Sequence, residues 1–78
     1  MSPALVNGWI EVAYTGPDRA TVELSVEPDV WLPAYLDYAA NGMRVAKVRP
    51  PAKLPSATVQ VKLRVDGTAS TLGWLAIK

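Results

Sequence analysis

The sequence contains no cysteine and no histidine. Without cysteine, no disulfide can cross-link the chain. Without either residue, a zinc site of the His/Cys type and a Ser–His or Cys–His catalytic pair are excluded. A lack of cysteine also fits a reducing compartment. We therefore expect an apolar core to stabilise the fold alone, with no metal and no cofactor.

Long apolar runs are also missing, since none approaches the roughly 18 residues that a membrane-spanning helix needs. Residues 1–6 lack the basic start and the apolar core of a signal peptide. We therefore expect a soluble, non-exported, cytoplasmic protein. The 78 residues predict a single small domain over 1–78, and an apolar fraction of 50% argues against disorder.

The clearest pattern that is present lies at residues 56–67. Four branched apolar residues alternate with polar ones, which places them on one face of a strand, and they are Val59, Val61, Leu63 and Val65. Asp66-Gly67 then predicts a tight hairpin turn. Regular pairing across that turn sets Val65 opposite Thr68 and Val59 opposite Trp74. Trp74 is therefore expected in the core, with Leu75 and Ile77 on the other face.

A second hairpin is expected from strands over 6–15 and 19–27. Gly16-Pro17-Asp18 is a typical turn sequence. Alignment of the apolar faces requires a three-residue loop with Val12 opposite Val22. This register also places Glu11 beside Glu23.

The middle of the chain predicts the remaining elements. A short helix is expected over about 33–41, because Pro33 suits a first helical turn and Asn41-Gly42 is a typical helix end. An edge strand is expected over 43–49, followed by a stiff proline connector over 50–55. The expected fold is α+β but mainly β, in the order β-β-α-β-β-β: a small antiparallel sheet or a partly open barrel.

Charge is divided unequally along the chain. Residues 1–42 carry six acidic side chains and one basic, a net charge of −5; residues 43–78 carry seven basic and one acidic, a net charge of +6. One interpretation is a nucleic-acid surface with Trp9, Trp31 or Tyr38 as stacking platforms, and its basic residues would be Arg44, Lys47, Arg49, Lys53, Lys62 and Arg64. The other interpretation sets Lys62 and Arg64 across the sheet from Glu11 and Glu23. The nearly balanced total charge favours this second interpretation.

Candidate catalytic groups are few. Glu11 and Glu23 are the one carboxylate pair that the expected register brings together, and a glycosidase requires such a pair across a cleft. A solvated strand face is the favoured explanation of the two glutamates, since surface charges usually have no such role. No nucleophile elbow and no glycine-rich phosphate loop is present. We therefore predict no catalytic residues, no enzymatic activity and no small-molecule substrate.

The remaining apolar residues suggest a docking surface. Trp9 falls on the glutamate-bearing face of its strand, and an exposed tryptophan among polar groups is a candidate interface anchor. Packing of Trp9 under the proline connector is the other interpretation, since large aromatic side chains dominate small cores. Leu75 and Ile77 lie on the second face of the last strand, where an edge could accept a partner strand. We therefore predict a non-enzymatic interaction protein with Trp9, Leu75 and Ile77 as partner-binding residues. It would act as an accessory protein, an inhibitor or an assembly factor, and would dock on a protein partner or form a homo-oligomer. Small phage-encoded proteins often have such roles, so by analogy we expect a viral source. The alternative is a nucleic-acid-binding small β-barrel.

Overall fold

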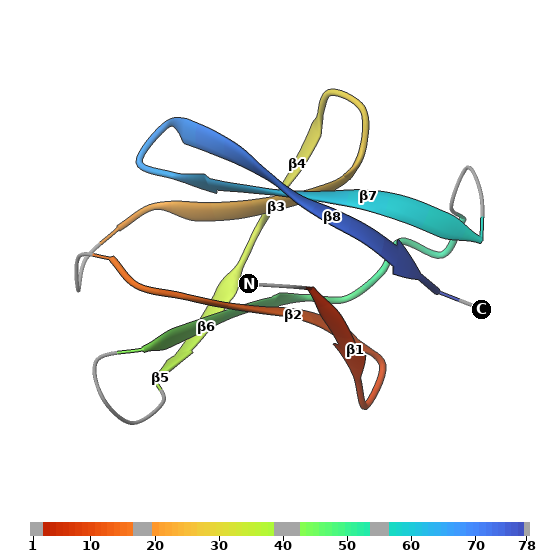
Figure 1. The fold of residues 1–78 in the computed structure, drawn as a ribbon, viewed down its shortest axis with the longest axis horizontal. Helices are drawn as coiled ribbons and strands as arrows, with labels where there is room; N and C mark the ends of the chain where they lie inside the picture. The colour runs from red at the N-terminus through yellow and green to blue at the C-terminus, as the bar shows by residue number, and fades with distance from the viewer. Residues whose placement is uncertain (1–2, 17–19, 39–42, 54–56, 78) are drawn as a thin grey trace.

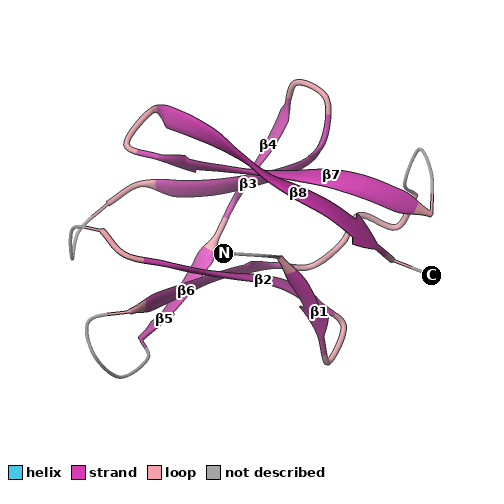
Figure 2. Ribbon diagram, in the orientation of Figure 1, coloured by secondary structure: helices cyan, strands magenta, loops and turns pink. Residues whose placement is uncertain are grey.

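Two four-stranded antiparallel sheets pack face to face in the computed structural model, which describes residues 3–16, 20–38, 43–53 and 57–77 (Figure 1). Every regular element in these residues is a strand (Figure 2). Sheet A has the order β1-β2-β6-β5, and sheet B has the order β4-β3-β7-β8. The strands are β1 (Ala4–Val6), β2 (Trp9–Tyr14), β3 (Val22–Glu27), β4 (Val30–Pro33), β5 (Tyr35–Tyr38), β6 (Arg44–Val48), β7 (Thr58–Val65) and β8 (Thr68–Ala76). The expectation of a mainly β antiparallel domain is confirmed.

The strand order is that of an immunoglobulin-like sandwich. Strands β1, β2, β6 and β5 take the places of A, B, E and D, and β3, β7 and β8 take those of C, F and G. Strand β4 lies beside β3, as an additional C′ strand does. This architecture supports many unrelated functions, so function must be argued from individual sites.

The core lies between the two sheets and is built from alternate residues of four strands. Its fully buried side chains include Ile10 and Val12 on β2, Leu24 on β3 and Val61 on β7, each with no exposed surface. Strands β2 and β7 correspond to the pair that a disulfide joins in antibody domains. Here both strands carry buried aliphatic side chains, and the sequence has no cysteine to join them.

The expected first hairpin is wrong. Strands β2 and β3 belong to different sheets, so Val12 and Val22 both face the core but are not paired on one ladder. Strand β2 pairs with β6 and sets Glu11 opposite Lys47, whereas β3 pairs with β7 and sets Glu23 opposite Arg64. Residues 17 and 18 of the expected loop lie outside the described residues. The apolar alternation showed which side chains face inward, but not which strand would be the partner.

The expected helix over 33–41 is also wrong for its described part. Residues 30–33 and 35–38 are strands β4 and β5, which carry the chain from sheet B to sheet A (Figure 1). Leu32, Ala34 and Leu36 pack against the core at every second position. This period of two is that of a strand. Residues 39–41 lie outside the described residues.

Two further details of the expected sheet are corrected. Strand β6 is not an edge strand, because it lies between β2 and β5 with Arg44, Ala46 and Val48 buried. The strand expected over 6–15 is broken by a turn at Asn7-Gly8, whose φ angles of 50° and 82° suit a tight hairpin. Asn-Gly is itself a typical hairpin signal that the sequence interpretation missed.

The last hairpin is confirmed at its turn and wrong beyond it. Val65 pairs with Thr68 around Asp66-Gly67, and Val59, Val61 and Leu63 are buried as expected. The register then shifts between Val61 and Lys62, so that Val61 pairs with Gly73 and Val59 with Leu75. Because β8 has one extra residue at this point, each later residue of β8 lies on the opposite side of the sheet from the one expected. Trp74 therefore lies outside, opposite Gln60, and Leu75 turns inward.

Candidate interaction site

The outer face of sheet A carries an aromatic pair. Trp9 lies on β2 and Tyr35 on β5, with ring centroids 5.7 Å apart and an interplanar angle of 89°. This edge-to-face geometry is one that aromatic rings prefer. Tyr35 remains 67% exposed, although a residue of its size is usually covered. The phenol ring of Tyr35 thus faces solvent while its edge-to-face partner, the indole of Trp9, lies against it.

Two cations hold the indole of Trp9. The guanidinium carbon of Arg49 lies 4.4 Å from the ring centroid, and Lys47 Nζ lies 5.2 Å from it. Lys47 also forms a 2.7 Å salt bridge to Asp37 Oδ2. A hydrogen bond to Asp37, with the charges of Asp37 and Glu11, raises the pKa of Lys47 above its usual 10.5. The ammonium of Lys47 is therefore neutralised locally, whereas Arg49 is exposed.

A groove of about 530 Å³ adjoins this pair, beside the point where the chain passes from β4 to β5. We call it the Trp9 groove, and its lining residues are Trp9, Leu32, Pro33, Ala34, Tyr35, Val48 and Arg49. Ala34 is fixed there because its backbone N–H donates to the Val22 carbonyl at 3.0 Å. The lining is apolar and aromatic except for Arg49, the one charged residue among the described residues that line it.

The structure does not bring the three predicted partner-binding residues together. Trp9 lies in the groove on sheet A, while Leu75 lies near the end of β8 on sheet B and Ile77 directly follows that strand. Both pack against the core, and the Ile77 backbone N–H donates to the Ala57 carbonyl at 2.7 Å. The register shift at Gly73 turned Leu75 inward, which the regular alternation of the sequence could not reveal.

The six basic residues proposed for nucleic acid are dispersed. Arg44 is buried on the inner side of β6, Lys53 follows the last strand of sheet A, and Lys47 and Arg49 lie near Trp9. Arg64 on β7 forms a 2.8 Å salt bridge to Glu23 and lies 4.2 Å from the Trp31 ring centroid. Lys62 lies opposite Ser25 on the outer side of sheet B.

The acidic half of the sequence meets the basic half across both sheets. Of the two basic residues expected across from Glu11 and Glu23, Arg64 forms a hydrogen bond and a salt bridge with Glu23. Glu11, however, lies opposite Lys47 and not Lys62. Glu11 and Glu23 belong to different sheets, so the expected carboxylate pair does not form. Two salt bridges, Asp37–Lys47 and Glu23–Arg64, thus join an acidic side chain of the first half to a basic one of the second.

Two other kinds of site are absent from the described residues. Residues 3–16, 20–38, 43–53 and 57–77 contain no cluster of three carboxylates that could hold a metal ion. Nor does this part of the chain contain a helix long and apolar enough to cross a membrane. Comparisons with protein-family models, with curated proteins and with solved structures found no match.

Tyr35 is the site residue that the sequence interpretation missed. It was assigned to a helix, where its neighbours would have been Leu32 and Ala39 and not Trp9. Leu32, Ala34 and Leu36 do recur at every second position, but Trp31 and Pro33 between them are also apolar. A short run of this kind does not distinguish a strand from a helix, so the sequence alone could not place Tyr35 on an exposed face.

Proposed function

We propose that this chain is a non-enzymatic interaction module that docks on a protein partner through the Trp9 groove. The observation that carries the proposal is Tyr35, a ring 67% exposed that lies edge-on against Trp9 at the rim of an apolar groove. Rigid aromatic side chains with a polar tip contribute strongly to protein interfaces, because little side-chain entropy is lost when they are covered.

The lining of the groove indicates the chemistry of the partner. Apolar and aromatic walls accept an apolar side chain or a proline-rich extended segment. Arg49 is held over Trp9, so its guanidinium is already oriented before a partner arrives. A carboxylate on the partner would receive a charge-assisted hydrogen bond from it. The groove therefore fits an extended peptide that carries an apolar side chain next to an acidic one.

Charge on the outer face of sheet A argues against nucleic acid as the preferred partner. Lys47 and Arg49 are matched there by Glu11 and Asp37. Nucleic-acid surfaces depend on an excess of cations, since phosphate neutralisation supplies most of their affinity. The cations that lie over Trp9 also occupy space that a stacked base would need.

The test is selection from a random peptide library displayed on phage, with the purified protein as the target. We expect enriched peptides to share an apolar or proline residue beside an acidic one, and Tyr35→Ala to reduce their binding about tenfold or more. Arg49→Ala should reduce binding of the acidic peptides selectively. Trp74→Ala is the matched control, because it removes an equally exposed ring on the other sheet.

Three outcomes would overturn the proposal. Selection could yield no common peptide, or Tyr35→Ala and Trp74→Ala could weaken binding equally. The protein could instead bind mixed oligonucleotides with an affinity that falls steeply with salt, which would favour the nucleic-acid alternative. Light-scattering chromatography of the same samples tests self-association, which Tyr35→Ala should abolish if the partner is a second copy.

A further inference from the structure

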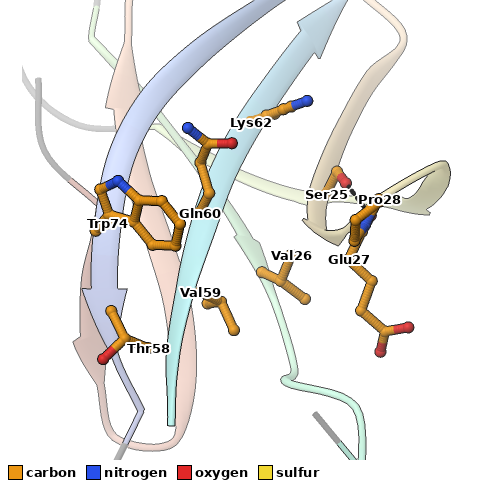
Figure 3. Close-up of a pocket in the computed structure, with 9 residues that line it drawn as sticks. All are labelled: Ser25, Val26, Glu27, Pro28, Thr58, Val59, Gln60, Lys62 and Trp74. Carbon is orange, nitrogen blue, oxygen red and sulfur yellow. Dashed lines mark hydrogen bonds between the residues drawn. The ribbon is translucent and has the colours of Figure 1, made fainter. Parts of the chain in front are cut away.

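A second pocket opens on sheet B, on the opposite side of the sandwich from the outer face of sheet A. It has a volume of about 260 Å³ and lies between the end of β3 and the start of β7 (Figure 3). The ladder between these strands ends at the pair Ser25–Lys62, and β7 continues from there beside β8 alone. The pocket therefore occupies the gap that forms where two neighbouring strands diverge.

Two irregularities of the sheet create this gap and its wall. The pairing of β3 with β4 shifts between Leu24 and Glu27, so that Leu24, Ser25 and Val26 are buried in succession. In β8, Gly73 has a φ of 137° and ends the bulge that turns Trp74 outward. Bulges often reorient a side chain next to a functional site. Here they leave the indole of Trp74 68% exposed at the border of the pocket.

The pocket combines one flat aromatic face with a mixed polar rim. Gln60 lies directly across the ladder from Trp74, and its amide can both donate and accept hydrogen bonds (Figure 3). Lys62 adds an ammonium donor and Glu27 a carboxylate acceptor, and among the described residues neither charge has a salt-bridge partner. Val26 and Val59 are buried beneath them. Ser25 is engaged internally, because its hydroxyl donates to the Glu27 carbonyl at 2.7 Å.

We propose that this pocket binds one ring of a neutral saccharide, with the ring stacked on Trp74. A pyranose has C–H groups on one face and hydroxyls around its edge, and each hydroxyl can both donate and accept. The apolar face matches the indole, and the hydroxyls match the amide of Gln60 and the charges of Lys62 and Glu27. The volume lies just below the usual range for drug-sized ligands, which suits a single ring.

Other ligands that stack on tryptophan fit the rim less well. A quaternary ammonium needs a cage of several rings, and Trp74 is the one aromatic residue among the described residues that line the pocket. A nucleotide brings a phosphate, which the single cation Lys62 would have to neutralise beside Glu27. A neutral ligand with many hydroxyls requires both donors and acceptors and no net charge, which is what this rim provides.

The test is tryptophan fluorescence and two-dimensional NMR of the intact chain, titrated with cellotetraose, maltotetraose and N,N′,N″,N‴-tetraacetylchitotetraose. We expect at least one of these sugars to bind in the millimolar range and to shift the amide signals of Gln60 and the indole signal of Trp74. Trp74→Ala should weaken that binding about tenfold or more, and Gln60→Ala should weaken it less. Tyr35→Ala is the matched control and should bind the sugar normally.

Trp74 is 68% exposed and Gln60 is half-buried on the same outer face, so neither variant should unfold the chain, and circular dichroism checks this. The proposal is overturned if no sugar of the panel shifts these signals, or if Trp74→Ala binds as well as the original chain. It is also overturned if mixed oligonucleotides shift the same signals and the sugars do not. None of these results bears on the Trp9 groove, since Tyr35 and Trp74 lie on different sheets.

Discussion

Trp9 and Trp74 lie on the outer faces of the two sheets, and their surroundings differ. Trp9 is covered by its own neighbours, because Arg49 and Lys47 lie over its ring and Tyr35 meets it edge-on. Trp74 is 68% exposed, and the side chain across the ladder from it is Gln60. One indole supports an exposed partner ring, whereas the other is itself the exposed ring.

Trp31 lies on sheet B, as Trp74 does, but its ring is covered as that of Trp9 is. Arg64 covers Trp31 and is fixed by Glu23, so this stack uses a salt bridge in the way that Asp37 fixes Lys47 on sheet A. Exposed cation–aromatic contacts contribute about 0.5–1 kcal/mol each to stability. The three tryptophans therefore fall into two classes. The rings of Trp9 and Trp31 are covered by cationic side chains and stabilise the sheets, whereas the ring of Trp74 is exposed and accessible to a ligand.

The largest expected effect separates the core from these outer rings. Leu24→Ala removes a side chain with no exposed surface and should lower the free energy of unfolding by about 3 kcal/mol. Trp74→Ala removes a larger side chain but should change stability by about 0.5 kcal/mol or less, since exposed positions contribute little. Urea unfolding followed by circular dichroism measures both values. If Trp74→Ala lowered the free energy of unfolding as much as Leu24→Ala, Trp74 would have to be a buried core residue.

A smaller effect is expected at the bulge that exposes Trp74. Gly73 has a φ of 137°, which side-chain-bearing residues rarely adopt, so Gly73→Ala should cost about 1–2 kcal/mol. Space is not the reason, because no atom lies within 4 Å of the added methyl group. Ser70→Ala is the control, since Ser70 is an exposed residue of the regular part of the same strand, and should be nearly neutral. Equal stabilities for the two variants would contradict the backbone explanation.

This bulge also explains why the pairing of β8 could not be predicted from the sequence. The alternation of Val59, Val61 and Leu63 predicted a strand and its buried face, and Asp66-Gly67 predicted the turn, because both are local properties of the chain. Whether β8 pairs regularly depends on a single glycine that can adopt an unusual φ. A glycine in a strand suggests a bulge but does not require one. Trp74 and Leu75 were therefore assigned to the wrong faces.

The pairing of strands far apart in the sequence was the second feature that could not be predicted. One interpretation of the charges placed Lys62 and Arg64 across from Glu11 and Glu23, and Arg64 does pair with Glu23. The partner of Glu11 was not predicted, because β2 and β3 were assumed to be neighbours in one sheet. The Trp9 groove depends on the crossing from β4 to β5 at Ala34, a feature of tertiary structure. Trp9 was singled out from its position on the strand, but Tyr35 could be found only after β5 was known.

The smallest expected effect tests the salt bridge that helps to close the stack on Trp9. Asp37 raises the pKa of Lys47 above 10.5 chiefly through a hydrogen bond, and Glu11 adds a weaker contribution. A raised pKa in the folded state means that the interaction stabilises the protein below pH 10.5 and is lost as the pH rises through the higher value. Asp37→Asn should therefore move the pKa of Lys47 back towards 10.5, and Glu11→Gln should move it less.

NMR titration of the Lys47 side chain between neutral and strongly alkaline pH measures this change in each variant. Overall stability should hardly respond, because exposed salt bridges contribute little and are screened by salt. If Asp37→Asn leaves the titration of Lys47 where it was, the carboxylate of Asp37 is not what raises the pKa of Lys47. Lys47 would then not be fixed over Trp9 by a salt bridge. The stack on Trp9 would differ in this respect from the stack on Trp31, where Glu23 fixes Arg64.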